Sequence, residues 1–268
     1  MARPRLGVVK FASCDGCQLT LLDLEDQLLG IAEQVEIVEF AEATSARSAG
    51  PYELLLVEGS VSTPEQAEAI VDLRRQAAKL VTIGACATTG GIQALRVFAD
   101  HDAWRASIYP HPEWIESLAT ATPIADHVPV DAELRGCPID PGQLLEFLTA
   151  TLLGRRPRLP DEAVCLACKR AGSVCVVVAH GEPCLGPVTR TGCGAICPAF
   201  GRGCYACFGP RETANVPGLR RSLVVLGNAP ADVDERFAGF TALAPPFARA
   251  AAAGLAAAAA TGGDDARR

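Results

Sequence analysis

Eight of the twelve cysteines lie within 43 residues, from Cys165 to Cys207. Their spacing is C-x2-C-x6-C-x8-C, then eight residues, and then C-x3-C-x6-C-x2-C. The eight thiols therefore divide into two sets of four, and each set contains one C-x2-C pair. Such a pair on a tight turn directs two thiolates at one metal centre, while the more distant cysteines complete a tetrahedral shell. Frequent glycine and proline are typical of backbone that wraps closely around a compact object.

Disulfides, structural zinc and iron–sulfur clusters all use sets of cysteines. The chain starts MARPRLGVV, without an apolar signal-peptide core, so we expect a reducing compartment and no disulfide framework. Zinc-ribbon pairs usually have about 15–20 residues between them. Here 35 residues separate Cys168 from Cys204, and four of them are cysteines. Two groups of four thiolates suit two [4Fe–4S] centres, so this segment favours clusters over zinc.

The composition narrows the class of protein. With 268 residues, the chain is long enough for one full domain and a smaller one. Hydrophobic residues make up 49% of it and aromatic residues only 5%, which predicts an aliphatic core. No apolar run approaches the length of a membrane span. A net charge of −7 argues against a nucleic-acid surface and weakens the interpretation of the cysteines as DNA-binding zinc modules.

The first half of the chain alternates between short aliphatic runs and helical patterns. Thr63-Pro64 and Asp140-Pro141 each combine an N-cap residue with a proline at the first helical position, so a helix is expected after each. A further helix is expected at 18–29. The expected strands are 5–12, 35–40, 52–57, 79–83 and, more weakly, 127–131. This alternation predicts an α/β fold with a flavodoxin-like, doubly wound parallel sheet.

The remaining four cysteines follow predicted strands. Cys14 and Cys17 come directly after the first strand, Cys86 after the fourth and Cys137 after the fifth. Because ligands of such sheets bind at the carboxyl ends of the strands, we expect these four thiols to converge on one edge. Buried core cysteines are the alternative for Cys86 and Cys137, but each stands in a turn that contains glycine. The sequence thus predicts a third set of four thiols.

Other segments are less regular. Residues 92–125 are expected to form an excursion with a helix near 113–118, whereas SLVVLG at 222–227 looks like a strand and 232–240 like a short helix. We expect three parts: a flavodoxin-like domain at 1–155, a small, loop-rich iron–sulfur domain at 156–247, and an alanine-rich tail at 248–268.

These motifs together resemble the small, electron-transferring subunit of [NiFe] hydrogenases, from residue 5 to about residue 247. The shared motifs are Cys14-x-x-Cys17, Glu58-Gly59, Gly84-x-Cys86, Gly136-Cys137-Pro138, Cys184-x-Gly-Pro-x-Thr and Cys204-x-x-Cys207. The resemblance implies three [4Fe–4S] clusters, with the Ni–Fe centre on a partner large subunit. It implies no catalytic residue on this chain.

The resemblance also assigns each thiol to a cluster. The implied ligands of the proximal cluster are Cys14, Cys17, Cys86 and Cys137; those of the medial cluster are Cys193, Cys197, Cys204 and Cys207; those of the distal cluster are Cys165, Cys168, Cys175 and Cys184. Membrane-bound relatives have a histidine in place of Cys165, and a proline with a three-iron centre in place of Cys197. They also carry a leader peptide and a membrane anchor, neither of which is expected here.

These differences make the chain similar to the cytoplasmic members of the family, most of all to the NAD(P)-linked sulfhydrogenase type. That resemblance implies a cytoplasmic protein with a large subunit and flavin- and iron–sulfur-containing diaphorase subunits as partners. The alternatives are a deazaflavin-linked or heterodisulfide-reductase-linked hydrogenase and, further away, a quinone-oxidoreductase-like subunit.

Glu58 follows the third predicted strand, on the same edge as the first four cysteines. It is either a helix-capping or surface carboxylate, or a residue that shapes the large-subunit interface or a proton exit. Many relatives have glutamate and threonine on either side of the first cysteine, where they are thought to relay protons. Ser13 and Asp15 stand at those positions, so the resemblance does not carry a proton route over to this chain.

Overall fold

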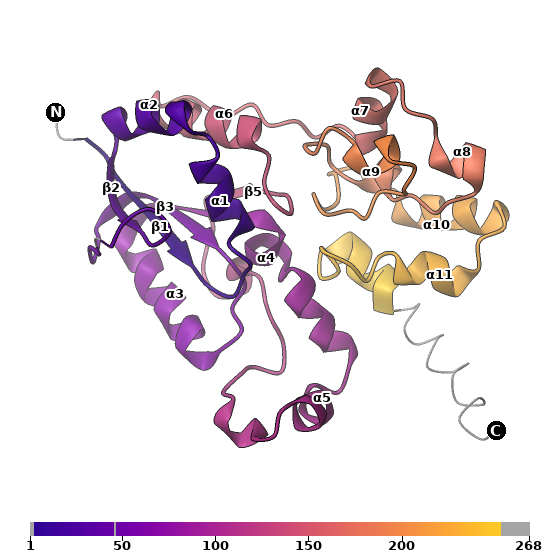
Figure 1. Cartoon of the computed structure of the whole chain (residues 1–268), viewed down its shortest axis with the longest axis horizontal. Coiled ribbons are helices and arrows are strands. Elements are labelled where there is room, and N and C mark those ends of the chain that lie inside the picture. Colours follow the sequence, from indigo (N-terminus) through magenta and orange to yellow (C-terminus); the bar gives the residue numbers. More distant parts are fainter. Residues whose placement is uncertain (1–2, 46, 253–268) are drawn as a thin grey trace. The chain divides into compact units, whose positions relative to one another are not determined.

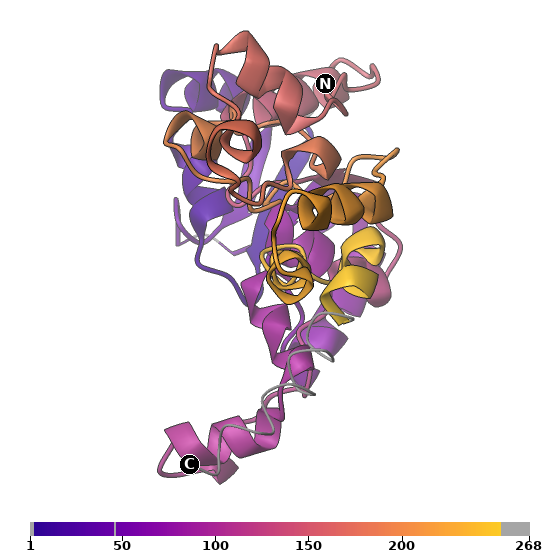
Figure 2. The same ribbon diagram turned by 90° about the vertical axis from the view of Figure 1, so that its right-hand side faces the viewer.

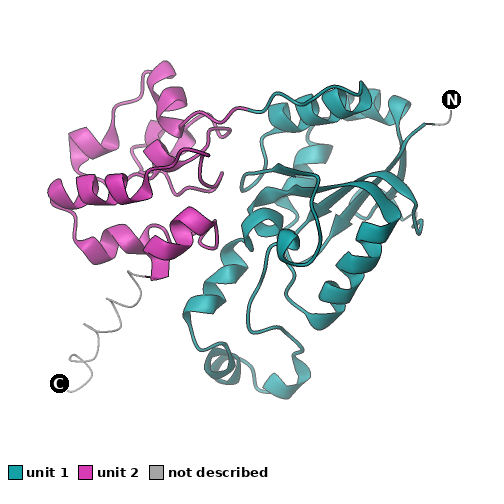
Figure 3. Cartoon of the chain, turned by 180° about the vertical axis from the view of Figure 1, so that it is seen from behind, with its two compact units in different colours: residues 1–159 teal, residues 160–268 magenta. Residues whose placement is uncertain are grey.

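The computed structural model describes residues 3–45 and 47–252. The chain divides into two compact units, Met1–Leu159 and Pro160–Arg268 (Figure 3). Four cysteines belong to the first unit and eight to the second. The predicted alanine-rich tail lies outside the described residues from residue 253 onward. None of the helices in the described part of the chain is long and apolar enough to cross a membrane.

The first unit is built on a five-stranded sheet whose strands all run parallel, in the order β2-β1-β3-β4-β5. This is the flavodoxin-like order, and it confirms the predicted fold class. The strands are β1 (Arg5–Lys10), β2 (Glu36–Phe40), β3 (Tyr52–Glu58), β4 (Ala77–Ile83) and β5 (Ala132–Leu134). Four of the five agree with the predicted strands to within about two residues at each end.

The register of the sheet brings the strand ends level. Lys10 pairs with Glu58, Glu58 with Ile83, and Ile83 with Leu134. Each of these is the last residue of its strand or of its ladder. The turns that follow β1, β3, β4 and β5 therefore start from a common line along one edge of the sheet.

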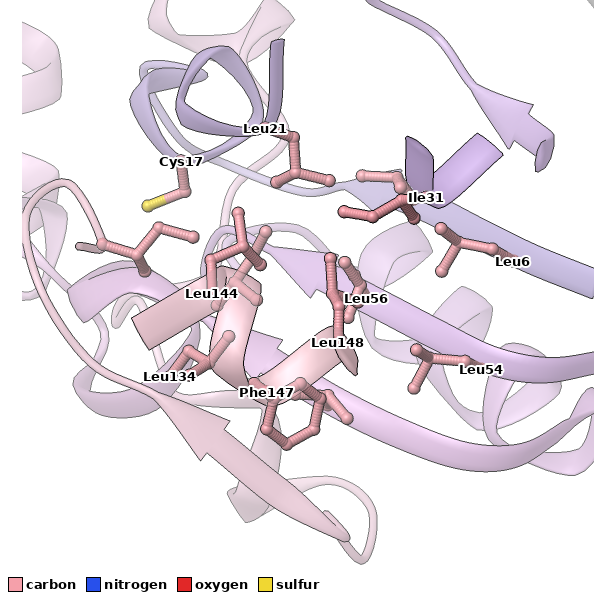
Figure 4. Packing of buried hydrophobic residues seen from close by; sticks show 14 of the residues in the cluster. Leu6, Cys17, Leu21, Ile31, Leu54, Leu56, Leu134, Leu144, Phe147 and Leu148 are labelled. Carbon is pink, nitrogen blue, oxygen red and sulfur yellow. The ribbon is translucent and has the colours of Figure 1, made fainter. Parts of the chain in front are cut away.

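Helices cover both faces of the sheet (Figure 1). One face packs against α1 (Gly16–Leu22), α2 (Asp26–Gln34) and α6 (Pro141–Leu152) through a cluster of buried aliphatic side chains, with Cys17 at one end (Figure 4). The other face packs against α3 (Pro64–Gln76) and a short helix at Ile124–Asp126, through Ile70 and Ile124. Each fully buried leucine or isoleucine contributes about 1.5–3 kcal/mol of transfer free energy, so this two-sided core fixes the sheet edge.

The two predicted helix starts are confirmed. Thr63 accepts the N–H of Gln66, and Asp140 accepts the N–H of Gln143. A proline occupies the first turn of each helix, where its missing N–H removes no hydrogen bond. Local capping chemistry was thus sufficient to place α3 and α6.

Two other predictions in this unit are wrong in detail. The helix expected at 18–29 is two helices, because α1 ends at Leu22 and α2 begins at Asp26. The fifth strand expected at 127–131 instead forms at Ala132–Leu134. Pro129 lacks an N–H for a ladder. The ladder starts only after Asp131, whose carboxylate accepts the Leu80 N–H.

The segment after β4 was expected to be a turn and an irregular excursion. It forms α4 (Gly84–Thr89), then η1 (Ile92–Phe98), α5 (His101–Ile108) and η2 (Pro112–Trp114). In both views the part that contains α5 projects away from the sheet of its own unit (Figures 1 and 2). The α-helix expected near 113–118 is wrong: only the single turn η2 forms there, and α5 was missed.

Among its described residues, the second unit consists of short helices joined by irregular segments. They include α7 (Val164–Arg170), α8 (Val176–His180), η4 (Gly186–Val188), α9 (Ile196–Ala199), α10 (Val216–Val225) and α11 (Pro230–Glu235). The helix expected at 232–240 is therefore shorter and begins earlier. The strand expected at 222–227 is wrong, because those residues belong mainly to α10. Asn215 caps that helix through the Gly218 N–H, and Val225 is 85% exposed, so the valine run is not a buried strand.

Candidate functional site

The sheet edge gathers the first set of cysteines. Cys14 precedes α1 and Cys17 lies in its first turn, while Cys86 lies in α4, directly after β4. Cys137 follows β5, two residues before Ile139, which packs in the same core cluster as Cys17. Since the strand ends are level, all four residues lie just beyond the same edge of the sheet.

The thiols of this set lie within electrostatic reach of one another. Burial raises the pKa of Cys137 to about 11, and the neighbouring Cys86 and Cys14 raise it further. Burial also raises the pKa of Cys17, with smaller contributions in the same direction from Cys137 and Cys86. Thiolates at Cys17, Cys86 and Cys137 would therefore repel one another and be poorly solvated. A cationic metal centre removes both penalties, and a metal-bound thiol is deprotonated outright.

Two glycines make room for the sulfurs. A Cβ atom on Gly84 would lie 2.4 Å from the Cys17 Sγ, and one on Gly91 would lie 2.5 Å from the Cys86 Sγ. Both glycines have positive φ, +87° and +68°, which other residues rarely adopt. The backbone thus passes directly beside the thiols, as expected where it encloses a compact group.

Unusual backbone recurs inside the cysteine motifs of both units. Four described residues other than glycine have positive φ: Asp15, Glu25, Ala195 and Ala206. All but Glu25 stand between two cysteines of one motif. Such conformations cost about 1–3 kcal/mol each and concentrate at functional sites. The positive φ at these three positions turns the backbone between neighbouring thiols.

Glu58 lies beneath this edge and not on the surface. Its side chain is only 2% exposed, and its carboxylate accepts the backbone N–H groups of Cys17 (3.2 Å) and Gln18 (3.1 Å). Burial raises the pKa of Glu58, while these two N–H groups act in the opposite direction. The contacts are those of a helix cap on α1, and they fix the backbone that carries Cys17.

The cap predicts different effects for two substitutions of Glu58. Glu58→Gln keeps an oxygen that accepts one N–H, whereas Glu58→Ala leaves two buried donors without an acceptor. We expect Glu58→Ala to lower the free energy of unfolding by about 1–3 kcal/mol and Glu58→Gln by less. Denaturant unfolding of the anaerobic protein measures both. If both variants match the wild-type stability while hydrogen turnover by the complex falls, Glu58 acts on protons or the interface and not as a cap.

The second unit brings the second set together around α7. Cys165 and Cys168 lie one turn apart on α7, and Cys175 is the N-cap residue of α8. Burial raises the pKa of Cys165 to about 11, and Cys184, Cys168 and Cys175 raise it further. Cys165 therefore lies within electrostatic reach of the other three thiols of this set.

The third set consists of two pairs. Burial raises the pKa of Cys197, which also feels Cys193 and Cys184. Burial likewise raises the pKa of Cys204, which feels Cys184 and Cys207. Cys184 thus lies beside both pairs.

A direct contact joins the second and third sets. The Cys204 N–H points at the Cys184 Sγ over 3.2 Å, and the Ala206 N–H points at the Cys204 Sγ over 3.4 Å. Hydrogen bonds from backbone N–H groups to ligand sulfurs are one means by which proteins tune iron–sulfur centres.

The spacing of the thiols bears on which metal they suit. Zinc at about 2.3 Å from each sulfur requires sulfurs about 3.8 Å apart in a tetrahedron. Within residues 3–45 and 47–252, no three cysteine, histidine, aspartate or glutamate side chains gather tightly enough to hold one metal ion. All twelve cysteines are free thiols. Sets of four thiolate sulfurs are the ligands both of structural zinc and of cubane iron–sulfur centres.

Sequence reasoning missed one residue at the first set. The Gln93 side chain, from η1, lies beside Cys86: its Oε1 is 3.6 Å from the Cys86 Sγ. Its Nε2 donates to the Ala12 carbonyl (2.6 Å) and to the Ser60 hydroxyl (3.2 Å). Nothing in the sequence separates this glutamine from a surface glutamine, because its partners are 33 and 81 residues away along the chain.

Comparison with known families gives a match over the first unit. The profile of the NADH ubiquinone oxidoreductase 20 kDa subunit family matches residues 14–151. This range includes Cys14, Cys17, Cys86 and Cys137 and all of the sheet after β1. It ends before the eight cysteines of the second unit.

Individual relatives extend further. The sulfhydrogenase 2 subunit delta of Pyrococcus furiosus is 40% identical over 215 residues, which cover 80% of this chain and 90% of that protein. An alignment of that length exceeds the first unit, so it includes part of the second. The NAD-reducing hydrogenase HoxS subunit delta of Cupriavidus necator is 28% identical over 181 residues, covering 60% of this chain and 87% of that protein.

A solved structure of an NAD+-reducing [NiFe]-hydrogenase in the H2-reduced state contains a similar chain. It superposes with a TM-score of 0.55 and 30% sequence identity, and it covers 59% of this chain and 96% of that chain.

Proposed function

This chain belongs to the NADH ubiquinone oxidoreductase 20 kDa subunit family, as a small [NiFe] hydrogenase subunit of the sulfhydrogenase type, and from that premise we propose how it works. It passes electrons one at a time between the Ni–Fe site of a large subunit and a diaphorase-type NAD(P) partner, through three [4Fe–4S] clusters. The observation that supports this proposal is that all twelve cysteines are free thiols, many of which lie close enough to another cysteine to raise its pKa.

Each set has a defined role in this scheme. Bound iron–sulfur clusters supply reversible one-electron storage. The proximal cluster is held by Cys14, Cys17, Cys86 and Cys137; the medial one by Cys193, Cys197, Cys204 and Cys207; the distal one by Cys165, Cys168, Cys175 and Cys184. The protein supplies thiolates, buried surroundings and N–H donors such as that of Cys204. Similar all-cysteine surroundings favour closely matched potentials, which electron transfer in both directions requires.

The proposal also includes the electron acceptor of the complex, a nicotinamide. A nicotinamide-linked partner agrees with the similarity to the HoxS subunit delta and to the NAD+-reducing enzyme. We expect flavin- and iron–sulfur-containing diaphorase subunits to co-purify with the complex. A deazaflavin-reducing or heterodisulfide-reducing subunit in their place would change the electron acceptor. The proposed path of electrons through the three clusters would stay the same. Free thiols that hold clusters suit the reducing cytoplasm, where we place the protein.

The large subunit is proposed to bind at the sheet edge that carries the proximal set. Two exposed apolar side chains flank that set: Leu19 on α1 is 47% exposed, and Ile92 at the start of η1 is 50% exposed. We expect Leu19→Asp and Ile92→Asp each to weaken binding of the large subunit at least about tenfold, which is about 1.4 kcal/mol. Co-purification and hydrogen turnover both report the loss, because the isolated chain carries no Ni–Fe site and should turn over no hydrogen.

Leu29→Asp is the matched control. Leu29 lies on α2 and is 65% exposed, and α2 leads to the start of β2, at the opposite edge of the sheet. It should leave binding of the large subunit unchanged. Equal binding of the large subunit by all three variants would contradict the proposed binding site. Hydrogen turnover by the nickel-free single chain would contradict the proposal that the Ni–Fe site lies on the large subunit.

Metal analysis tests the proposal as a whole. Anaerobically purified protein should hold about twelve iron and about twelve sulfide per chain, because three cubanes are expected. Stoichiometric zinc with little iron would contradict electron transfer and would indicate that the cysteines hold structural zinc. About eight iron would instead show that one of the three sets is not a cluster site.

A further inference from the structure

Gln93 joins three turns at the edge of the sheet. Its amide contacts Cys86, Ala12 and Ser60, which follow β4, β1 and β3. Ala12 and Ser60 also pair with each other through two backbone hydrogen bonds of 3.1 Å and 3.0 Å. Ala12 stands two residues before Cys14. One side chain therefore sets the position of the Cys86 sulfur relative to the turn that carries Cys14.

The orientation of this amide follows from its partners. The Nε2 atom has two acceptors, the Ala12 carbonyl at 2.6 Å and the Ser60 hydroxyl at 3.2 Å. In a flipped amide, the Gln93 side-chain oxygen would face the Ala12 carbonyl oxygen at 2.6 Å. Neither oxygen carries a hydrogen to donate, so the two would repel each other. The hydrogen-bond network thus assigns the oxygen to the Cys86 side.

This oxygen has a consequence for a bound cluster. A thiol at Cys86 donates its hydrogen to Oε1, but a metal-bound thiolate has none to donate. The negative end of the amide dipole then faces an anionic sulfur 3.6 Å away. One-electron reduction adds further negative charge to the same group. The dipole opposes that charge, and the potential of such a centre responds to dipoles and hydrogen bonds at its sulfurs.

We propose that Gln93 is a positioning residue that holds Cys86 in place and lowers the reduction potential of the centre held by Cys14, Cys17, Cys86 and Cys137. The inference rests on the proposed function, because it requires a cluster at this set. A low reduction potential at this position keeps the potential of the first electron acceptor close to that of the hydrogen couple.

The test is an EPR-monitored redox titration of the anaerobic complex. The proximal signal is identified by its absence from a Cys137→Ser variant. Gln93→Met keeps the length of the side chain and removes the dipole. At the wild-type midpoint we expect its reduced-to-oxidised ratio to be about threefold or more above the wild type, which means a raised potential. Gln93→Ala removes the amide entirely and should shift the ratio in the same direction as Gln93→Met.

Gln34→Met is the control. Gln34 lies at the end of α2, and its side-chain amide donates to the Gly30 carbonyl one turn earlier, over 3.5 Å. It should leave the midpoint unchanged. An unchanged midpoint in both Gln93 variants, with wild-type iron content, would overturn this inference and leave the proposed function standing. A lowered midpoint in Gln93→Met would also overturn it, because the amide N–H would then face the sulfur. Wild-type protein without a cluster at this set would overturn both.

Discussion

Replacing Cys197 with proline is expected to convert the medial centre into a [3Fe–4S] cluster of higher potential. Cys197 lies at the second position of α9, within electrostatic reach of Cys193 and Cys184, and the substitution removes one of the four proposed thiolate ligands. An N–H at that position has no intrahelical acceptor, so proline is compatible with the backbone. The iron that loses its protein ligand should be released on oxidation.

The expected effect on electron flow is large. Each rise of about 59 mV disfavours onward one-electron transfer tenfold at equilibrium, so a rise of about 120 mV costs about a hundredfold. Electrons should then reach a high-potential dye far more easily than a nicotinamide partner. EPR of the variant, beside assays with both acceptors, measures this.

Cys197→Ala is the companion variant, since it removes the thiolate without the proline ring. It should give the same three-iron signal. An unchanged [4Fe–4S] spectrum in both variants, with both activities intact, would show that Cys197 is not a ligand and that the proposed medial set is wrong.

Replacing Gly84 with alanine is expected to abolish the proximal centre. The added Cβ would lie 2.4 Å from the Cys17 Sγ, a separation that no relaxed structure shows. The site cannot relieve it cheaply, because Cys17 is buried and its backbone N–H is held by Glu58. Iron content should fall from about twelve to about eight per chain. Hydrogen turnover should stop, since the first electron acceptor is lost.

Gly154→Ala separates the crowding from the backbone strain. Gly154 also has positive φ, +66°, but nothing lies within 4 Å of a Cβ there. It should lose about 1–2 kcal/mol of stability and keep all its iron. Equal iron content in the two alanine variants would mean that the cluster does not require the close approach at Gly84.

Much of the first unit could be predicted from the sequence because its signals are local. Short aliphatic runs placed four strands, and Thr63 and Asp140 placed two helices through caps that the structure contains. The cysteines after these strands indicated one common edge, since parallel strands end together. Each inference used neighbouring residues and one general rule of sheet topology.

The failures have a common physical cause. The valines of α10 favour a strand, but Asn215 and the burial of Leu223 against its neighbours make a helix. The positive φ of Ala195 and Ala206 cannot be read from alanine, which normally avoids it. Gln93 depends on Ala12 and Ser60, far away in sequence. In each case the observed structure depends on tertiary contacts. These contacts either override the local sequence preference or act where there is none.

The contact between Cys184 and Cys204 has a consequence for how charge is stored. In the proposed assignment these residues hold different centres, yet the N–H of one points at the sulfur of the other over 3.2 Å. An electron held by either set therefore repels a second electron from the other. If both sets hold centres as proposed, the two would load anticooperatively, and a titration would report two macroscopic midpoints that belong to the pair and not to either centre alone. Mutual repulsion of this kind favours delivery of electrons singly, even from two centres whose intrinsic potentials are closely matched.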